Sequence, residues 1–600
     1  METKEITRTR GGAFLLQETH PENVFTPEDF SEEQRMMRDA VKEFIDREVW
    51  PNKHRFEQKD YDFTFELMRK AGELGFLGIC VPEAYGGLEM GFVSTMLVCD
   101  YFSGATGSLS TAYGAHTGIG IMPIVLYGTE EQKQKYVPKL ASGEEIGCYC
   151  LTEPGAGSDA NSGKTKAVLS DDGTHYKISG QKIWISNAGY ASVMIVFARI
   201  EDDKNITGFI VPYDPKNGIT LGEEEHKLGI HASSTRQVFF SDTKVPVENM
   251  LSERGNGFKI AMNALNVGRI KLAVACIDAQ RRTVSESVRY ANERIQFKTP
   301  ISQFGAIKQK IANMATNCYV GESGCYRAAK DIEDRITIRA ESGISHQEAE
   351  LKGVEEYVIE CSILKVAVSE HTQDCTDEGV QIFGGMGYSA EMPMESAWRD
   401  ARISRIYEGT NEINRMLTVG MLIKKAIKGH LDLIGPATAV GEELLGIPSF
   451  DTPDFSAPLS EEKSILRNLK KVFLMIAGAG VQKYGTELEQ HQQLLLAVSD
   501  ILIEIYMVES AILRTEKNIN RYGVDAQQTQ LAMTKLYLFQ AVEKIQSKGK
   551  EAIISSAEGD EQKMLLMGLK RFTKYANHPN VIDLRKQIAD KVIAENQYCL

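Results

Sequence analysis

The stretch YCLTEPGAGSD at residues 149–159 stands where the chain changes from helical to β-rich sequence. Upstream, Ser31 and Gln34 have the spacing of a capping box, and helical signals continue to about residue 145. Downstream, Asp171-Asp172-Gly173 is a hairpin signal, and β-rich runs follow at 175–179, 182–186, 193–200 and 207–212. Helical periodicity resumes near residue 257 and runs to about residue 430. This order predicts a multidomain α+β fold.

The chain of 600 residues is long enough for several hydrophobic cores. Residues 431–459 contain four of the 17 prolines, which predicts a linker, and residues beyond it are again helical. The predicted parts are an N-terminal extension (1–29), a helical N-terminal domain (30–147), a central β-barrel or sandwich-like domain (148–256), a helical-bundle catalytic domain (257–430), the linker (431–459) and an additional C-terminal helical domain (460–600).

The formal net charge of −14 argues against nucleic acid as a partner, because phosphate binding requires clustered Lys and Arg. No run approaches the roughly 18 apolar residues that span a bilayer, so no transmembrane segment is expected. The N-terminus lacks the apolar core of a signal peptide and carries acidic residues, which indicates a cytoplasmic, bacterial protein. Of the ten cysteines, the close pair Cys148 and Cys150 is expected to point to opposite faces of a strand. We therefore expect reduced thiols and no metal site.

Four short motifs are candidates for chemistry. The loop at 149–159 lets backbone N–H groups approach a ligand, and Trp184 and Ser186 lie two apart on a predicted strand, where a ring and a donor suit a flavin. Glycine clusters follow at QIFGGMG (381–387) and YEGTNE (407–412), the latter with a carboxylate beside a helix start. Taken singly, each motif also fits a purely structural role, namely a glycine-rich turn, a core tryptophan or helix capping.

In this order and spacing the motifs resemble the acyl-CoA dehydrogenase family across about residues 30–430. The stretch LNVGR (265–269) and the long C-terminal extension resemble its very-long-chain branch. The resemblance implies FAD as cofactor, an acyl-CoA substrate, electron-transferring flavoprotein as acceptor and a homodimer or homotetramer. It also implies FAD-dependent α,β-dehydrogenation of long-chain acyl-CoA to trans-2-enoyl-CoA in fatty-acid β-oxidation.

The resemblance assigns residues to three roles. Glu408 would be the catalytic base. The implied FAD-binding residues are Tyr149, Leu151, Thr152, Gly157, Ser158, Trp184, Ile185, Ser186, Arg294, Gln296, Gln381, Ile382, Phe383, Gly384, Gly385, Thr410, Asn411 and Glu412. Of this set, Arg294, Gln296 and residues 381–385 would reach the FAD of a neighbouring subunit. The implied substrate-binding residues are Ser158, Ser110, Gly114, Leu265, Asn266, Arg269, Tyr407 and Gly409.

The chemistry explains this set of residues. A thioester α-hydrogen is too weakly acidic to be removed by a carboxylate in water, so the site must stabilise the negative charge that develops on the enolate oxygen. In the family, the hydrogen-bond donors to this oxygen are the backbone N–H of the catalytic glutamate and a ribityl hydroxyl of FAD. Desolvation would raise the pKa of Glu408, and the β-hydrogen would leave as hydride to flavin N5. Some relatives have the catalytic base at the position directly before the arginine that corresponds to Arg269. Here that position is Gly268, which leaves Glu408 as the base.

Two departures and three open questions accompany the resemblance. Ser396 stands where a Lys or Arg is usual in the family, and Lys298 replaces a common glycine.

Ser110 and Gly114 share a helix face, where small residues would leave a deep acyl pocket, although Gly114 would equally permit close helix packing. An acyl-CoA oxidase and a non-catalytic scaffold relative stay open as alternatives. The absence of Lys and Arg from residues 431–459 makes peripheral membrane contact doubtful.

Overall fold

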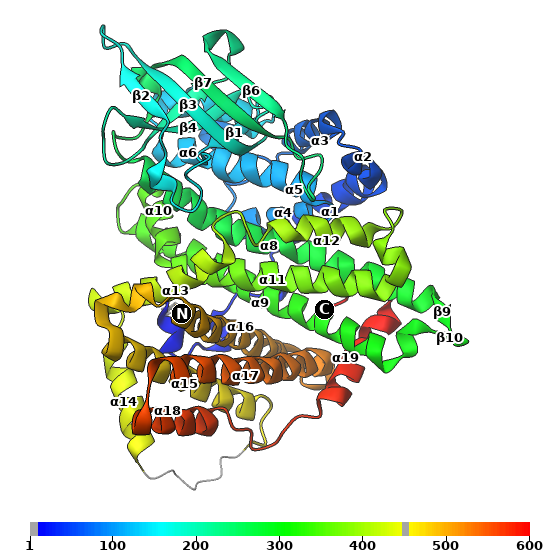
Figure 1. The fold of residues 1–600 in the computed structure, drawn as a ribbon. Helices are drawn as coiled ribbons and strands as arrows, with labels where there is room; N and C mark the ends of the chain where they lie inside the picture. Colours follow the sequence, from blue (N-terminus) through cyan, green and yellow to red (C-terminus); the bar gives the residue numbers. More distant parts are fainter. Residues whose placement is uncertain (1–9, 447–454) are drawn as a thin grey trace.

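The computed structural model describes residues 10–446 and 455–600 and consists of three layers (Figure 1). A β-domain and the N-terminal helices lie at the top, a bundle of long helices crosses the middle, and the C-terminal helices form the base. The predicted α+β, multidomain fold class is confirmed. The N-terminal helices are α1 (Glu32–Phe44), α2 (Lys53–Glu57), α3 (Tyr61–Glu73), α4 (Phe92–Ser103), α5 (Gly107–Gly114), α6 (Met122–Tyr127) and α7 (Glu130–Ala141).

Local signals account for many of the element boundaries. The capping box of Ser31 and Gln34 starts α1, with Ser31 Oγ accepting from the Gln34 N–H at 3.1 Å. The predicted hairpin turn joins two antiparallel strands and has Gly173 at φ +69°. The strands are β1 (Gly147–Cys150), β2 (Lys166–Leu169), β3 (His175–Ser186), β4 (Val193–Ile200), β5 (Thr207–Pro212), β6 (Ile219–Glu224), β7 (Thr235–Pro246) and β8 (Met250–Leu251).

The β-domain is sandwich-like, as expected. Its strands follow the order β6-β7-β3-β2-β4-β5-β8, with β1 parallel to β4, and the two halves meet where β2 runs parallel to β4. Apolar side chains from both halves, among them Ile178, Met194 and Phe209, share one buried core. Cys148 and Cys150 belong to this core, and the expectation that they point to opposite faces is wrong. Residues two apart on a strand share a face, and their sulfurs lie 3.9 Å apart as free thiols.

The bundle and the C-terminal layer share a second core that also includes the N-terminal helices. The bundle consists of α8 (Gly257–Glu293), the hairpin strands β9 (Ile295–Gln296) and β10 (Thr299–Pro300), α9 (Gly305–Glu341), α10 (His346–Glu356), α11 (Val358–Phe383), α12 (Pro393–Ile403) and α13 (Asn411–Ile427). The C-terminal helices are α14 (Ile434–Leu445), α15 (Ser460–Tyr484), α16 (Gln492–Tyr522), α17 (Gln528–Ser556), α18 (Gly559–Phe572) and α19 (Val581–Glu595).

The segment predicted as a linker contains the helix α14, which packs against α15. Pro436 is compatible with this helix because it lies in the first turn, where an N–H has no intrahelical partner. Residues 447–454 of the same segment lie outside the described residues. Proline content therefore marked this part of the chain without excluding a helix.

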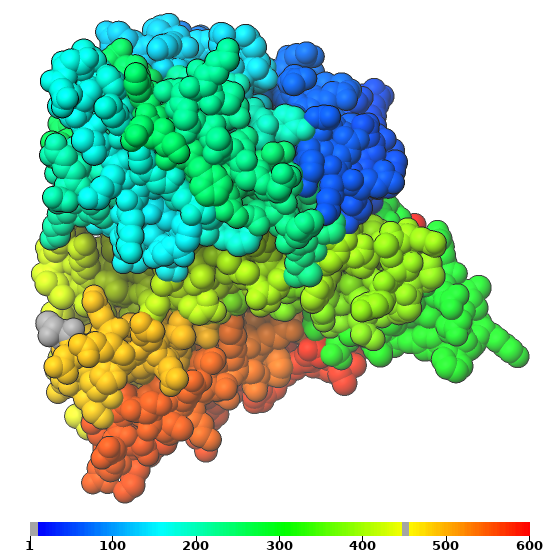
Figure 2. Space-filling view, turned by 45° about the horizontal axis from the view of Figure 1, so that its top comes forward, coloured from blue at the N-terminus to red at the C-terminus, as the bar shows by residue number. Residues whose placement is uncertain are grey.

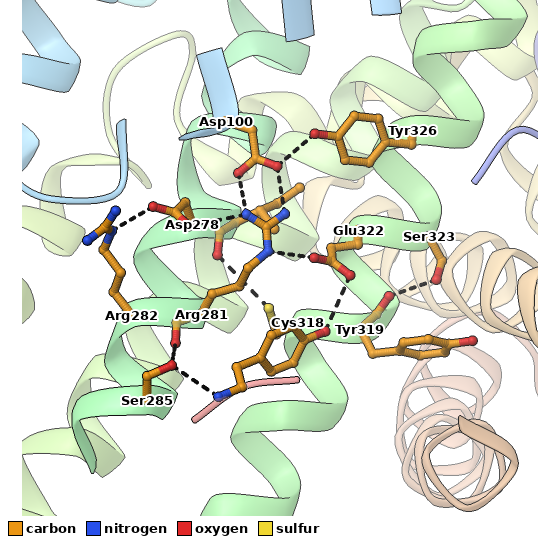
Figure 3. A network of polar contacts seen from close by, with 12 residues as sticks. Asp100, Asp278, Arg281, Arg282, Ser285, Cys318, Tyr319, Glu322, Ser323 and Tyr326 are labelled. Atoms are coloured by element: carbon orange, nitrogen blue, oxygen red, sulfur yellow. Dashed lines mark hydrogen bonds and ion pairs between the residues drawn. The ribbon is translucent and has the colours of Figure 1, made fainter. Parts of the chain in front are cut away.

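A buried ion network joins three of the predicted domains, and Figure 3 shows its centre around Arg281 and Glu322. Arg281 of α8 contacts Asp100 of α4 at 2.7 Å and Glu322 of α9 at 2.6 Å. Glu322 also accepts from Arg514 of α16 at 3.0 Å, and Arg514 pairs with Glu28 of the N-terminal extension at 2.7 Å. These contacts hold the C-terminal layer and the N-terminal extension against the bundle.

One described helix, α8, has the length and composition of a membrane span, and 78% of its apolar window is buried inside the protein, as in the core helix of a globular protein.

Candidate active site

A cavity of about 960 Å³ lies between the β-domain, the N-terminal helices and the bundle. Its walls come from α5, the loop after β1, the end of β3, one face of α8 and the loop between α12 and α13. Sixteen of the predicted site residues line it, namely Ser110, Gly114, Tyr149, Leu151, Thr152, Gly157, Ser158, Trp184, Ile185, Ser186, Leu265, Arg269, Tyr407, Glu408, Gly409 and Thr410. The fold therefore collects motifs that lie far apart in the sequence.

Glu408 stands in a strained turn between α12 and α13. Its φ is +58° and that of Gly409 is +79°, and a positive φ is unusual for a residue with a side chain. Thr410 caps α13 by accepting from the Ile413 N–H at 3.2 Å. The Asn414 side-chain amide donates to the carbonyls of residues 408, 409 and 410 at 3.3, 2.8 and 3.1 Å. These hydrogen bonds hold the turn that directs the carboxyl group.

The Glu408 carboxyl group has the environment of a base. Its Oε2 is buried without a hydrogen-bond partner in the described part of the protein. Burial raises the pKa of Glu408 to about 7, while the nearby cations Arg269 and Lys365 act to lower it. A carboxyl group with a pKa near neutrality is half ionised at pH 7, which suits a group that must take up a proton.

Gly268 of α8 makes room for this carboxyl group. A Cβ atom at position 268 would lie 2.5 Å from Glu408 Oε2, closer than real Cβ contacts. The sequence showed only that Gly268 cannot itself be a base. The structure adds that any side chain at this position would displace the Glu408 carboxyl.

Lys365 of α11 is a residue that the sequence analysis missed. Its side chain is buried, and its Nζ donates to the Gly409 carbonyl and to Asn411 Oδ1, both at 2.7 Å. The available signal was a lysine inside the apolar stretch SILKVAV (362–368) of a helix. Lysine is almost never fully buried unless paired, so a lysine in such a stretch indicates a specific partner.

The loop after β1 and the end of β3 form another part of the cavity wall. The Glu153–Lys182 ion pair, 2.6 Å long and buried, fastens the loop to β3, and the Ile183 N–H donates to the Thr152 carbonyl at 2.9 Å. A register shift between Lys182 and Ile185 places Trp184 at φ +58° with 56% of its surface exposed. Trp184 is therefore not a buried core tryptophan, which was the alternative interpretation of this residue.

These residues fit FAD. The cavity is large, the Trp184 ring borders it uncovered, and Cβ atoms at Gly155 or Gly157 would meet no described atom within 4 Å. Such open glycines let a ligand approach the backbone closely. Tyr149 Oη is buried and lacks a partner among the described residues.

The other predicted site residues lie outside the cavity. Arg294 and Gln296 are exposed on the β9–β10 hairpin, which projects from the body of the protein (Figure 2, green, at the right). Gln381, Gly384 and Gly385 are exposed at the end of α11, whereas Ile382 and Phe383 are buried.

The remaining three lie close to the cavity wall or on the surface. Asn266 is buried and accepts from Arg269 Nη1 at 2.7 Å, so it lies behind a lining residue. Asn411 contacts Lys365 beneath the base, and Glu412 is exposed in the first turn of α13.

Comparisons with known proteins give the class of this protein. Four family models match: acyl-CoA dehydrogenase N-terminal domain at residues 31–144, middle domain at 148–243, C-terminal domain at 255–421, and a further C-terminal domain model at 468–571. The chain belongs to the acyl-CoA dehydrogenase family, and it is an FAD-dependent enzyme of that family. The predicted resemblance, enzyme class and cofactor are confirmed.

Individual relatives match most or all of the chain. A probable acyl-CoA dehydrogenase of Bacillus subtilis is 42% identical over 598 residues, covering 100% of both chains. The rat mitochondrial very-long-chain-specific acyl-CoA dehydrogenase is 33% identical, over 84% of this chain and 77% of that protein. Among solved structures, an acyl-CoA dehydrogenase from Bacillus anthracis complexed with FAD has a TM-score of 0.94 at 43% identity, covering 98% of this chain and 100% of that one.

Proposed function

We propose that the protein dehydrogenates long-chain acyl-CoA thioesters between Cα and Cβ to trans-2-enoyl-CoA in fatty-acid β-oxidation, with Glu408 as the base. The observation that carries the proposal is the unpartnered Glu408 Oε2, which faces the cavity from a strained turn. Because its pKa is near 7, the carboxylate can accept the α-proton of a bound thioester at neutral pH.

The chain's own residues would bind and orient the reactants. The backbone N–H of Glu408 would donate to the thioester oxygen as negative charge develops there. Trp184, Ser186, Thr152 and the glycine loop would hold FAD, which supplies the acceptor for the β-hydrogen. Excluding water from the buried base keeps its pKa high enough to remove a weakly acidic proton.

The shape of the cavity supports a long acyl chain. Gly268, Leu272, Ala275 and Ala279 line it along one face of α8, a span of about 17 Å at the rise of an α-helix. An extended chain with C–C bonds of about 1.5 Å advances about 1.3 Å per carbon, so this span accommodates about 13 carbons. At Gly114, a Cβ atom would meet no described atom within 4 Å, which argues against the close-packing role for this glycine.

Partners and location follow from the same proposal. We propose electron-transferring flavoprotein as the acceptor and a homodimer or homotetramer, in which Arg294, Gln296 and residues 381–385 reach the FAD of another subunit. Arg294, Gln296, Gln381, Gly384 and Gly385 are exposed on this chain, away from its own cavity, which supports that role. A cytoplasmic location in a bacterium is consistent with the Bacillus relatives.

The substitution Glu408→Gln tests the proposal. It preserves the shape of the side chain and removes the base, so FAD and acyl-CoA should still bind while flavin reduction slows by several orders of magnitude. The measurement is anaerobic bleaching of the flavin after mixing with palmitoyl-CoA. Reduction at nearly the wild-type rate in the variant would place the base elsewhere, and wild-type protein that is colourless would favour the scaffold alternative. Rapid reoxidation by oxygen would favour the oxidase.

A further inference from the structure

We propose that Lys365 is a positioning residue that fixes the turn carrying Glu408 and stabilises the ionised form of its carboxyl group. The inference rests on the proposed role of Glu408 as the base. It assigns a function to a buried lysine that lies 44 positions from its partner Gly409 in the sequence.

The contacts of Lys365 reach the two residues that hold the turn after the base. Its Nζ donates to the Gly409 carbonyl and to Asn411 Oδ1, each at 2.7 Å, and the Asn411 amide in turn donates to Ser369 at 3.1 Å and to Glu370 at 3.0 Å. A turn with positive φ at Glu408, a residue with a side chain, persists only where its surroundings fix it. Lys365 supplies such a fixed point from α11.

The charge of Lys365 acts on the same carboxyl group. The charged and titratable groups that face Glu408 are Arg269 from α8, Lys365 from α11, Tyr149 from β1 and the adjacent Tyr407. Of these groups, the two cations favour the carboxylate. One nitrogen of Arg269, Nη1, already donates to Asn266 at 2.7 Å, while its Nε lacks a partner among the described residues.

The surroundings of Lys365 allow it to remain a cation. Burial lowers its pKa to about 8, and Glu408, Cys276 and Glu370 oppose that effect while Arg269 adds to it. At pH 7 the ammonium form therefore predominates. Replacing it with a neutral side chain removes one of the two cations that oppose desolvation of Glu408, so the pKa of the base should rise.

The experiment compares two changes on the same turn. Lys365→Met removes the charge and its two hydrogen bonds, and Asn414→Ala removes three hydrogen bonds to the same turn without changing charge. The rate of flavin reduction by subsaturating palmitoyl-CoA is measured between pH 6 and pH 9. We expect Lys365→Met to move the acid limb of the pH–rate profile, where the rate rises with pH, to higher pH. A limb displaced from about pH 7 to about pH 8 would lower the rate at pH 7 about fivefold, in addition to any loss of the plateau. Asn414→Ala should lower the plateau and leave the limb in place.

A direct readout avoids dependence on catalysis. Infrared difference spectra against Glu408→Gln follow the protonation of the Glu408 carboxyl in each background, and the transition should move to higher pH in Lys365→Met. Lys365→Gln, which keeps a donor toward Gly409, should move the limb equally while retaining more of the plateau, and it carries the test if the methionine variant loses FAD.

The outcomes separate the two proposals. An unchanged limb and infrared transition in a folded, FAD-containing Lys365→Met protein would overturn the role of Lys365. Failure of wild-type flavin to be reduced by any acyl-CoA would instead overturn the proposed function.

Discussion

The pH dependence of flavin reduction should follow the ionisation of Glu408. Burial raises the pKa of this carboxyl from its ordinary value of 4.5 to about 7, and only the carboxylate can accept the α-proton. The rate therefore rises with pH. With a pKa of about 7, about a tenth of the carboxyl groups are ionised at pH 6 and about nine tenths at pH 8, an increase of about tenfold.

The assay is anaerobic stopped-flow reduction of the flavin at acyl-CoA concentrations below saturation, because that regime reports the pKa values of the free enzyme. Glu350 provides a matched control, since burial also raises its pKa to about 7 although it does not line the cavity. Glu350→Gln should retain the acid limb. A rate that is flat from pH 6 to pH 8, or a limb that disappears in Glu350→Gln, would refute the reasoning.

Three further outcomes are expected. The catalytic efficiency should rise from butyryl-CoA through octanoyl-CoA to palmitoyl-CoA. Gly114→Gln should lower the efficiency with long substrates most, because each methylene excluded from the pocket loses about 0.8 kcal/mol of binding free energy, about fourfold in efficiency. A wild-type optimum at four to eight carbons, measured with an artificial acceptor, would contradict this. Arg281→Met should lower the free energy of unfolding by about 3 to 5 kcal/mol in denaturant titrations, since it leaves Asp100 buried without its cation and removes one of the two arginines that pair with Glu322. A loss below about 1 kcal/mol would show that the network contributes little. The protein should stay in the supernatant when anionic liposomes are pelleted at physiological salt, because residues 431–459 lack basic side chains, and quantitative pelleting would argue for membrane association.

Some of the site follows from local sequence. The glycine loop at 149–159, the Trp184–Ser186 pair and the YEGTNE turn each carry their own signal, because turn residues, strand alternation and helix caps depend on neighbours a few positions away. The strands β4 and β5 have the bounds that their β-rich runs predicted. The same local reasoning missed α14, since four prolines outweighed its apolar residues.

The amino-acid sequence by itself determined the family, the order of helical and β-rich segments and the identity of the candidate base. Only the tertiary structure showed that Glu408 Oε2 lies against Gly268, that Lys365 donates to the Gly409 carbonyl, and that open space surrounds Gly114. The physical reason is that these properties depend on contacts between segments distant in the chain. A carboxyl group acquires a pKa near 7 only when packed helices remove water from it and bring cations from α8 and α11 beside it.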